Sequence, residues 1–299
     1  MQMPSKAARP SLVERAAEAY RLAEQINAQV ERQIVEIEQK QPAQESIRQQ
    51  TSSGVPGRVA HVDRAELAEA GFILPDAAPT ALAEEFRIVK RQLLLSAMGG
   101  QGAEPVPYGR AILVSSAEPD EGKTYCAVNL ALSLARERDV EVLLVDADFA
   151  KPEILSTLGI AGGPGLVDAL CDPSIDVESC VIATDLAGLS VLPAGRQLNE
   201  TNELLASEEM RKLFEKLLSR PSRIVIFDSS PALAASTSSV LASLVGQTIV
   251  VVRADVTGEN ELREALSLLG ACDHMRLLLN AAQLAPPGKR FGAYYGYGA

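Results

Sequence analysis

Tryptophan is absent from this chain of 299 residues, histidine occurs twice and cysteine four times. The cysteines form no CxxC pair, and His61 and His274 lie far apart in the sequence, so we expect neither a zinc site nor a disulfide framework. Basic residues are also scarce, because 28 Lys and Arg stand against 39 Asp and Glu for a net charge of -11. This balance argues against a protein that binds nucleic acid by neutralising phosphates.

Long apolar runs are missing as well. No stretch approaches the roughly 18 to 20 apolar residues that span a bilayer, and the N-terminal MQMPSKAARP lacks the apolar region of a signal peptide. The sequence therefore predicts a cytoplasmic protein. Its length suffices for one sizeable α/β domain with accessory segments, or for two small domains.

The first 61 residues divide into a predicted helix and a predicted linker. Within residues 1–40, apolar side chains recur at spacings of three and four from Ala16 to Ile37, which predicts an amphipathic helix. Residues 41–61 are rich in Gln, Ser, Pro and Gly, as flexible linkers are. Three interpretations of the helix stay open: it packs on the main domain, it docks on a partner or a second copy, or it is disordered.

Residues 62–285 are predicted to form the main domain. Thr80 can cap a charged helix over residues 80–98, and after Tyr108 short β-branched or leucine runs alternate with longer amphipathic stretches. Strands that alternate with helices predict an α/β fold, with a mainly parallel sheet covered by helices on both faces. Residues 286–299 show no periodicity and are expected to form a mobile tail.

A Gly-Lys-Thr motif follows the first strong strand, inside SSAEPDEGKT and directly before an apolar helix. Loop amides and a helix N-terminus would donate to phosphate oxygens, Lys123 would bind the β- and γ-phosphates of ATP, and Thr124 would ligate Mg²⁺. The motif alone is not specific, since Ala117 stands where the usual pattern has its first glycine. The predicted nucleotide contacts here are Glu121, Gly122, Lys123, Thr124 and Tyr125.

Carboxylates follow two of the predicted strands. Asp146 and Asp148 end one strand and Asp228 ends a later one, and the carboxyl ends of parallel strands share one edge of the sheet. There they could hold Mg²⁺, and one could accept a proton. Any single aspartate could merely cap a helix, but three beside a P-loop predict a P-loop NTPase site. Asn280 ends the last strand and is either a base contact or a turn residue.

These residues together resemble the bacterial tyrosine kinases of exopolysaccharide biosynthesis, in particular the autokinases associated with exosortase systems. The similarity covers roughly residues 62–299 and rests on AEEFRIVKRQLL, SSAEPDEGKT, LLVDADFAKP, ELL and IVIFDSSP. It implies ATP and Mg²⁺ as cofactors, with Thr124, Asp146 and Asp228 as metal ligands. It also implies that the catalytic residues are Lys123, Asp146, Asp148 and Asp228.

The resemblance further implies an assembly. Glu84, Arg87 and Lys90 match an ExxRxxR-like helix that joins family subunits into a ring, with lysine in the last place. The family's tyrosine-rich tail is phosphorylated in trans within the ring, and that place is taken here by Tyr294, Tyr295 and Tyr297. The implied partners are a cognate tyrosine phosphatase and a transmembrane chain-length regulator, which would activate the kinase and keep it at the inner membrane.

Two positions depart from the family pattern: Asp120 replaces a glycine and Ala150 an arginine. Because aspartate tolerates a left-handed backbone better than most residues, we expect Asp120 to keep the loop shape, with its charge turned outward or paired with a cation. Two other functions stay open. One is a partitioning or division-site ATPase, against which Glu118 stands at the place of that class's signature lysine. The other is an ATP-binding regulatory subunit without kinase activity.

Overall fold

The computed structural model describes residues 59–78, 80–100, 102, 104–198 and 201–282. All of them belong to one unit of the chain, Pro56–Ala299. The predicted helix of residues 1–40, most of the linker and the tail with Tyr294, Tyr295 and Tyr297 lie outside the described residues.

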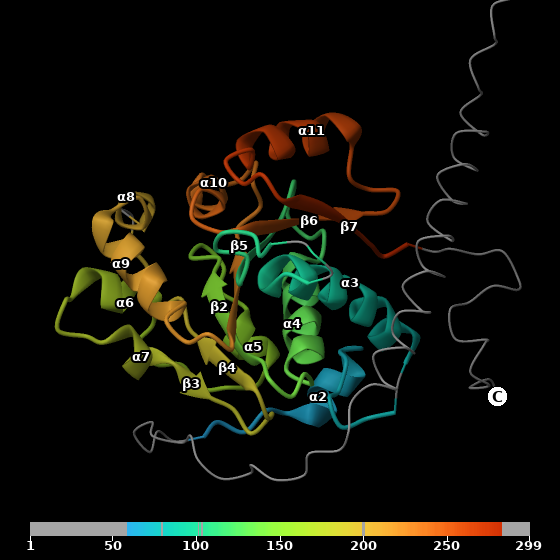
Figure 1. The fold of residues 1–299 in the computed structure, drawn as a ribbon, viewed down its shortest axis with the longest axis horizontal. Coiled ribbons are helices and arrows are strands. Elements are labelled where there is room, and N and C mark those ends of the chain that lie inside the picture. Colours follow the sequence, from blue (N-terminus) through green and yellow to red (C-terminus); the bar gives the residue numbers. More distant parts are fainter. Residues whose placement is uncertain (1–58, 79, 101, 103, 199–200, 283–299) are drawn as a thin grey trace, which may run out of the picture. The chain divides into compact units, whose positions relative to one another are not determined.

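A seven-stranded sheet with the order β3-β4-β2-β5-β1-β6-β7 forms the centre of the described part (Figure 1). Only β3 runs antiparallel to its neighbour β4, and every other pair is parallel. The prediction of a mainly parallel sheet is therefore confirmed. The strands are β1 (Ala111–Ser116), β2 (Glu141–Ala147), β3 (Ile182–Ala183), β4 (Leu189–Leu192), β5 (Arg223–Ser229), β6 (Gln247–Arg253) and β7 (Met275–Asn280).

Helices cover both faces of this sheet (Figure 1). One apolar cluster packs α2, α3, α4 and α5 against one face, and a second packs α6 to α11 against the other. The helices are α2 (Arg64–Glu69), α3 (Ala81–Met98), α4 (Lys123–Leu134), α5 (Ile154–Thr157), α6 (Leu166–Cys171), α7 (Val177–Cys180), α8 (Thr201–Leu205), α9 (Glu208–Leu217), α10 (Thr237–Ala242) and α11 (Glu259–Leu268).

The helices α3 and α4, which pack against each other, form for different reasons. Thr80 caps α3 as predicted, because its hydroxyl accepts a hydrogen bond from the Ala83 amide at 3.1 Å. In α4 every residue from Cys126 to Leu134 is buried, as expected of a helix that is apolar all round. Burial on all sides gives α4 a fixed position, so its first residue, Lys123, is also held in place.

A polar cluster around Asp185 fastens the start of the described chain to the sheet. Asp185 accepts hydrogen bonds from the Val62 amide at 3.0 Å and from Arg64 Nη1 at 2.7 Å, and His61 Nδ1 lies 2.7 Å from it. Arg64 above all, then the Val62 amide, holds the pKa of Asp185 well below its usual range. The folded state therefore favours the ionised form of this carboxyl group.

We expect Asp185→Asn to lower the free energy of unfolding by on the order of 1 to 2 kcal/mol at pH 7. Since the pKa of Asp185 is lower in the folded than in the unfolded chain, this contribution is complete above about pH 4 and declines as the pH falls further. Urea unfolding at pH 7 and pH 3 measures it, with Asp76→Asn as a control for an exposed carboxylate 3.9 Å from Arg64. A loss that is equal at both pH values would contradict the assignment.

Candidate active site

The P-loop connects β1 to α4 and contains two residues with unusual backbone angles. Gly122 has φ of 92°, and a Cβ atom there would lie 2.1 Å from Asn280 Nδ2, so any other residue would be strained and would displace the Asn280 side chain. Asp120 has φ of 60°, which confirms that it adopts the left-handed conformation. Its side chain is exposed, and together with the nearer Glu153 it raises the pKa of Lys151. The exposed side chain agrees with the predicted outward placement of this charge.

Lys123 is held by Asp148 in this structure. Its Nζ atom lies 2.9 Å from Asp148 Oδ2, and the two side chains are 12% and 6% exposed. The other oxygen, Oδ1, accepts hydrogen bonds from Ser230 Oγ at 2.9 Å and from the Lys151 amide at 3.2 Å. Both oxygens of Asp148 thus have donors.

Asp146 and Asp228 lie side by side in the register of β2 and β5. Asp146 Oδ2 accepts a hydrogen bond from the Ile154 amide at 3.0 Å, whereas Asp146 Oδ1 and both Asp228 oxygens are buried without a hydrogen bond of good geometry to any described residue. Burial raises the pKa of both carboxyl groups to about 7, and Lys123 opposes the shift in each. Thr124 also opposes it for Asp228.

Buried carboxylate oxygens that lack donors fit a cation. Asp146 and Asp228 belong to neighbouring strands, and Thr124 lies close enough to Asp228 to influence its pKa. Among the described residues no group of three or more His, Cys, Asp or Glu forms an all-protein metal cage. Mg²⁺ usually binds one or two carboxylates and completes its shell with phosphate oxygens and water.

A cavity of about 470 Å³ opens over this site. Of the predicted nucleotide contacts, Gly122, Lys123, Thr124 and Tyr125 line it, whereas Asn280 lies behind the loop and donates from Nδ2 to the Glu121 carbonyl at 2.9 Å. The cavity is lined by Pro119, Asp120, Gly122, Lys123, Thr124, Tyr125, Asp148, Ala150, Lys151, Glu153, Ser230, Pro231, Ala234 and Ala235. Sequence reasoning missed Ser230, whose only signal was its place two residues after Asp228.

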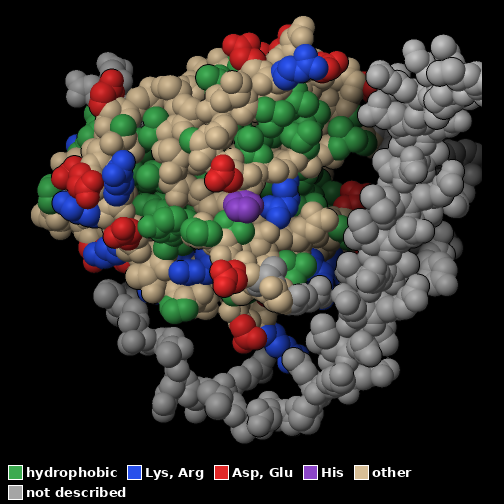
Figure 2. Space-filling model, turned by 45° about the horizontal axis from the view of Figure 1, so that its top comes forward, with side chains coloured by type: hydrophobic (Ala, Val, Ile, Leu, Met, Phe, Trp, Pro, Cys, Tyr) green, Lys and Arg blue, Asp and Glu red, His purple; other side chains and the backbone are tan. Residues whose placement is uncertain are grey.

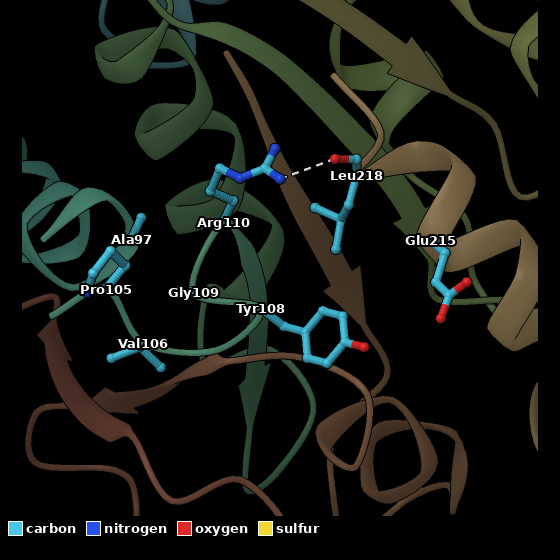
Figure 3. Close-up of a pocket in the computed structure, with 8 residues that line it drawn as sticks. All are labelled: Ala97, Pro105, Val106, Tyr108, Gly109, Arg110, Glu215 and Leu218. Atoms are coloured by element: carbon cyan, nitrogen blue, oxygen red, sulfur yellow. Dashed lines mark hydrogen bonds between the residues drawn. The ribbon is translucent and has the colours of Figure 1, made fainter. Parts of the chain in front are cut away.

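A second cavity, of about 380 Å³, lies at the opposite, amino end of β1 (Figure 3). Arg110 lines it, but its guanidinium donates to the carbonyls of Leu218 at 2.9 Å and Arg220 at 2.6 Å. Tyr108 and Glu215 supply the other polar groups at its wall. The guanidinium of Arg110 already donates to backbone carbonyls. This cavity is therefore a poorer binding site for phosphates than the P-loop cavity.

The three residues predicted to join subunits have different environments on α3. Glu84 and Arg87 pair with each other at 2.7 Å and are 33% and 51% exposed. Lys90 is only 10% exposed, and its ammonium binds the Ser133 carbonyl at 2.9 Å and Glu137 at 2.7 Å. In this structure Lys90 therefore fastens α3 to α4 instead of facing outward, and of the other two members of the motif Arg87 is exposed and Glu84 is partly exposed.

The surface of the described part has mixed charge. On the face drawn in Figure 2, Lys and Arg are interspersed with Asp and Glu, and apolar side chains gather in patches between them. None of the described helices is both long enough and apolar enough to cross a membrane.

Comparison with known proteins gives concordant results. A family model described as an AAA domain matches residues 109–268. The tyrosine-protein kinase YwqD of Bacillus subtilis (strain 168) is 30% identical over 189 residues, which are 62% of this chain and 78% of YwqD. The tyrosine-protein kinase wzc of Salmonella typhimurium is 28% identical over 221 residues, 74% of this chain but 29% of wzc. The chain thus spans most of the one relative and less than a third of the other.

Among solved structures, the crystal structure of the VpsO kinase domain superposes with a TM-score of 0.54 and 31% sequence identity. The match covers 65% of this chain and 94% of that domain.

Proposed function

This chain belongs to the family of bacterial tyrosine-protein kinases, and from that premise we propose that it is an ATP-dependent tyrosine autokinase of exopolysaccharide biosynthesis. The observation that carries the proposal is the group formed by Lys123, Asp148 and the buried pair Asp146 and Asp228 at the carboxyl edge of the sheet. The kinase relatives favour this function over that of a partitioning or division-site ATPase.

ATP would bind in the P-loop cavity, with its phosphates at the amides of residues 121–124 and at Lys123. Mg²⁺, held by Thr124, Asp146 and Asp228, would neutralise charge on the transferring phosphate when it is bound. Lys123 would have to move from Asp148 to the phosphates, which frees one carboxylate oxygen of Asp148. Since Asp148 lines the cavity and Asp146 does not, Asp148 is our candidate for the group that accepts the tyrosine proton.

The assembly belongs to the same proposal. Glu84 and Arg87 would contact a neighbouring subunit in a ring, and the tail of each subunit would reach the next active site. Fully extended, the last ten or so residues span on the order of 35 Å. A transmembrane chain-length regulator would activate the kinase and place it at the inner membrane, and a tyrosine phosphatase would reset it.

Intact-mass analysis of dephosphorylated full-length protein after incubation with Mg-ATP tests the proposal. We expect wild type to gain up to three steps of about 80 Da, one per phosphoryl group, and the triple Tyr→Phe variant at 294, 295 and 297 to gain none. Tyr108→Phe is the matched control, because Tyr108 is 55% exposed and lies outside the tail, and it should gain mass as wild type does. A wild type that binds ATP but never gains mass, even with the regulator's cytoplasmic segment, would instead be a regulatory subunit.

A further inference from the structure

The P-loop is connected by side-chain hydrogen bonds to the last residues of β6 and β7. Arg253, the last residue of β6, donates from Nη1 to the Asp120 carbonyl at 2.8 Å. Asn280, the last residue of β7, donates from Nδ2 to the next carbonyl, that of Glu121, at 2.9 Å. The left-handed turn of the loop is thus held from outside at two consecutive peptide groups.

The Glu121 side chain makes a third connection. It is 1% exposed, Oε2 accepts a hydrogen bond from the Glu118 amide at 3.0 Å, and Oε1 accepts one from the Thr257 hydroxyl. Among the described residues, no Lys or Arg lies within ion-pair distance of it. The Glu121 side chain therefore joins the start of the P-loop to Thr257 by hydrogen bonds alone.

The turn that supplies Thr257 is itself closed by hydrogen bonds. The Thr257 hydroxyl accepts from the Arg253 amide at 2.8 Å, and the Thr257 amide donates to the Arg253 carbonyl at 3.0 Å. The Ala254 amide donates to the Asn280 carbonyl at 2.9 Å, which joins the turn to β7. Arg253 and Thr257 are therefore fixed relative to each other and to the sheet, and both of them reach the P-loop.

We propose that Arg253 and Thr257 are positioning residues that hold the phosphate-binding loop in its ATP-binding conformation before the nucleotide arrives. The inference rests on the proposed binding of ATP at Lys123. A P-loop binds phosphates by aiming backbone amides at them, and a loop that must first become ordered loses affinity. We call the hydrogen bonds from Arg253 and Thr257 to the P-loop the brace. Loss of the brace should therefore raise the Kd for ATP more than it lowers kcat.

Thr257→Val tests this inference because it keeps the side-chain shape and removes the hydroxyl. We expect the Kd for a non-hydrolysable ATP analogue with Mg²⁺ to rise about tenfold in the full-length protein, with the KM for ATP rising in parallel and kcat changing less than about twofold. Thr257→Ser restores the hydroxyl and should bind within about twofold of wild type. Val256→Thr is the matched control, since Val256 lies in the same turn and is 65% exposed.

Glu121→Gln separates a brace from a catalytic charge. The amide oxygen can still accept from Glu118, but the amide nitrogen can only donate to Thr257, whose hydroxyl proton then loses its acceptor. The brace is therefore weakened, and the Kd should rise about threefold to tenfold while turnover persists. If instead Glu121→Gln abolishes turnover while the Kd is unchanged, Glu121 acts through its charge and the inference is overturned. Unchanged ATP binding in folded Thr257→Val would overturn it as well.

Arg253→Met keeps the test decisive if Thr257→Val does not fold. It leaves the hydrogen bonds of Thr257 in place and removes only the bond to the Asp120 carbonyl, so the Kd should rise about threefold to tenfold, and Arg253→Lys should recover part of that loss. Because the readout is nucleotide binding, weaker binding in these variants supports the brace even if no phosphotyrosine forms. A failure of the kinase proposal would therefore not be mistaken for a failure of this one.

Discussion

Replacing Lys123 by methionine is expected to lower the rate of autophosphorylation by at least about 10²-fold to 10³-fold. Methionine keeps the apolar stem of the side chain but removes the cation that would stabilise the β- and γ-phosphates in the transition state. The rate at which phosphotyrosine appears in intact protein, under saturating Mg-ATP, measures the effect. Lys216→Met is the matched control, because Lys216 also pairs with an aspartate, Asp176 at 2.9 Å, but is half-exposed on α9.

The Lys123→Met variant must be shown to fold, since Lys123 serves the nucleotide-free protein as well. It is the ion-pair partner of Asp148 and opposes the raised pKa of Asp146 and Asp228. Its loss leaves three buried carboxylates without that cation, which destabilises the folded state. Thermal unfolding without nucleotide detects this loss. A folded Lys123→Met that gains phosphotyrosine at the wild-type rate would show that Lys123 does not bind the transferring phosphate.

The sequence was sufficient to predict the sheet and the edge at which the site lies. Runs such as RIVIFDSS are short, β-branched and apolar, and they end in aspartate, so buried parallel strands with carboxylates at one edge follow from local pattern alone. The left-handed conformation of Asp120 was also predictable, because it depends on residue type and on the loop. Such features are encoded within a few consecutive residues.

Contacts between distant segments could not be predicted in this way. Lys90 belongs to a charged run that suggests a solvated face, yet it is buried because Ser133 and Glu137 of another segment supply its partners. Ser230 reaches Asp148 across 82 positions, and Arg253 reaches Asp120 across 133. Periodicity contains no information about such pairs. They appear only when the order of the strands brings the loops together.

Asp228→Asn is expected to lower kinase activity by roughly 10²-fold to 10³-fold and to stabilise the metal-free protein at neutral pH. The loss of activity follows if Asp228 is a ligand of Mg²⁺. The gain in stability follows from burial, because neither oxygen of Asp228 forms a well-aligned hydrogen bond with the described residues and ionised Asp228 is therefore poorly compensated. Activity is measured with saturating Mg-ATP, and stability by urea unfolding with EDTA.

The pH dependence of that gain has a definite sign. Burial raises the pKa of Asp228 to about 7 in the folded protein, above its unfolded value near 4, so this carboxyl group costs more stability as the pH rises between those values. The advantage of Asp228→Asn over wild type should therefore grow by on the order of 2 kcal/mol between pH 5 and pH 8. Asp176→Asn, whose pKa is lowered by Lys216, should show no such gain. Parallel stability curves for Asp228→Asn and wild type would mean that Asp228 has the same pKa in the folded, metal-free protein as in the unfolded chain.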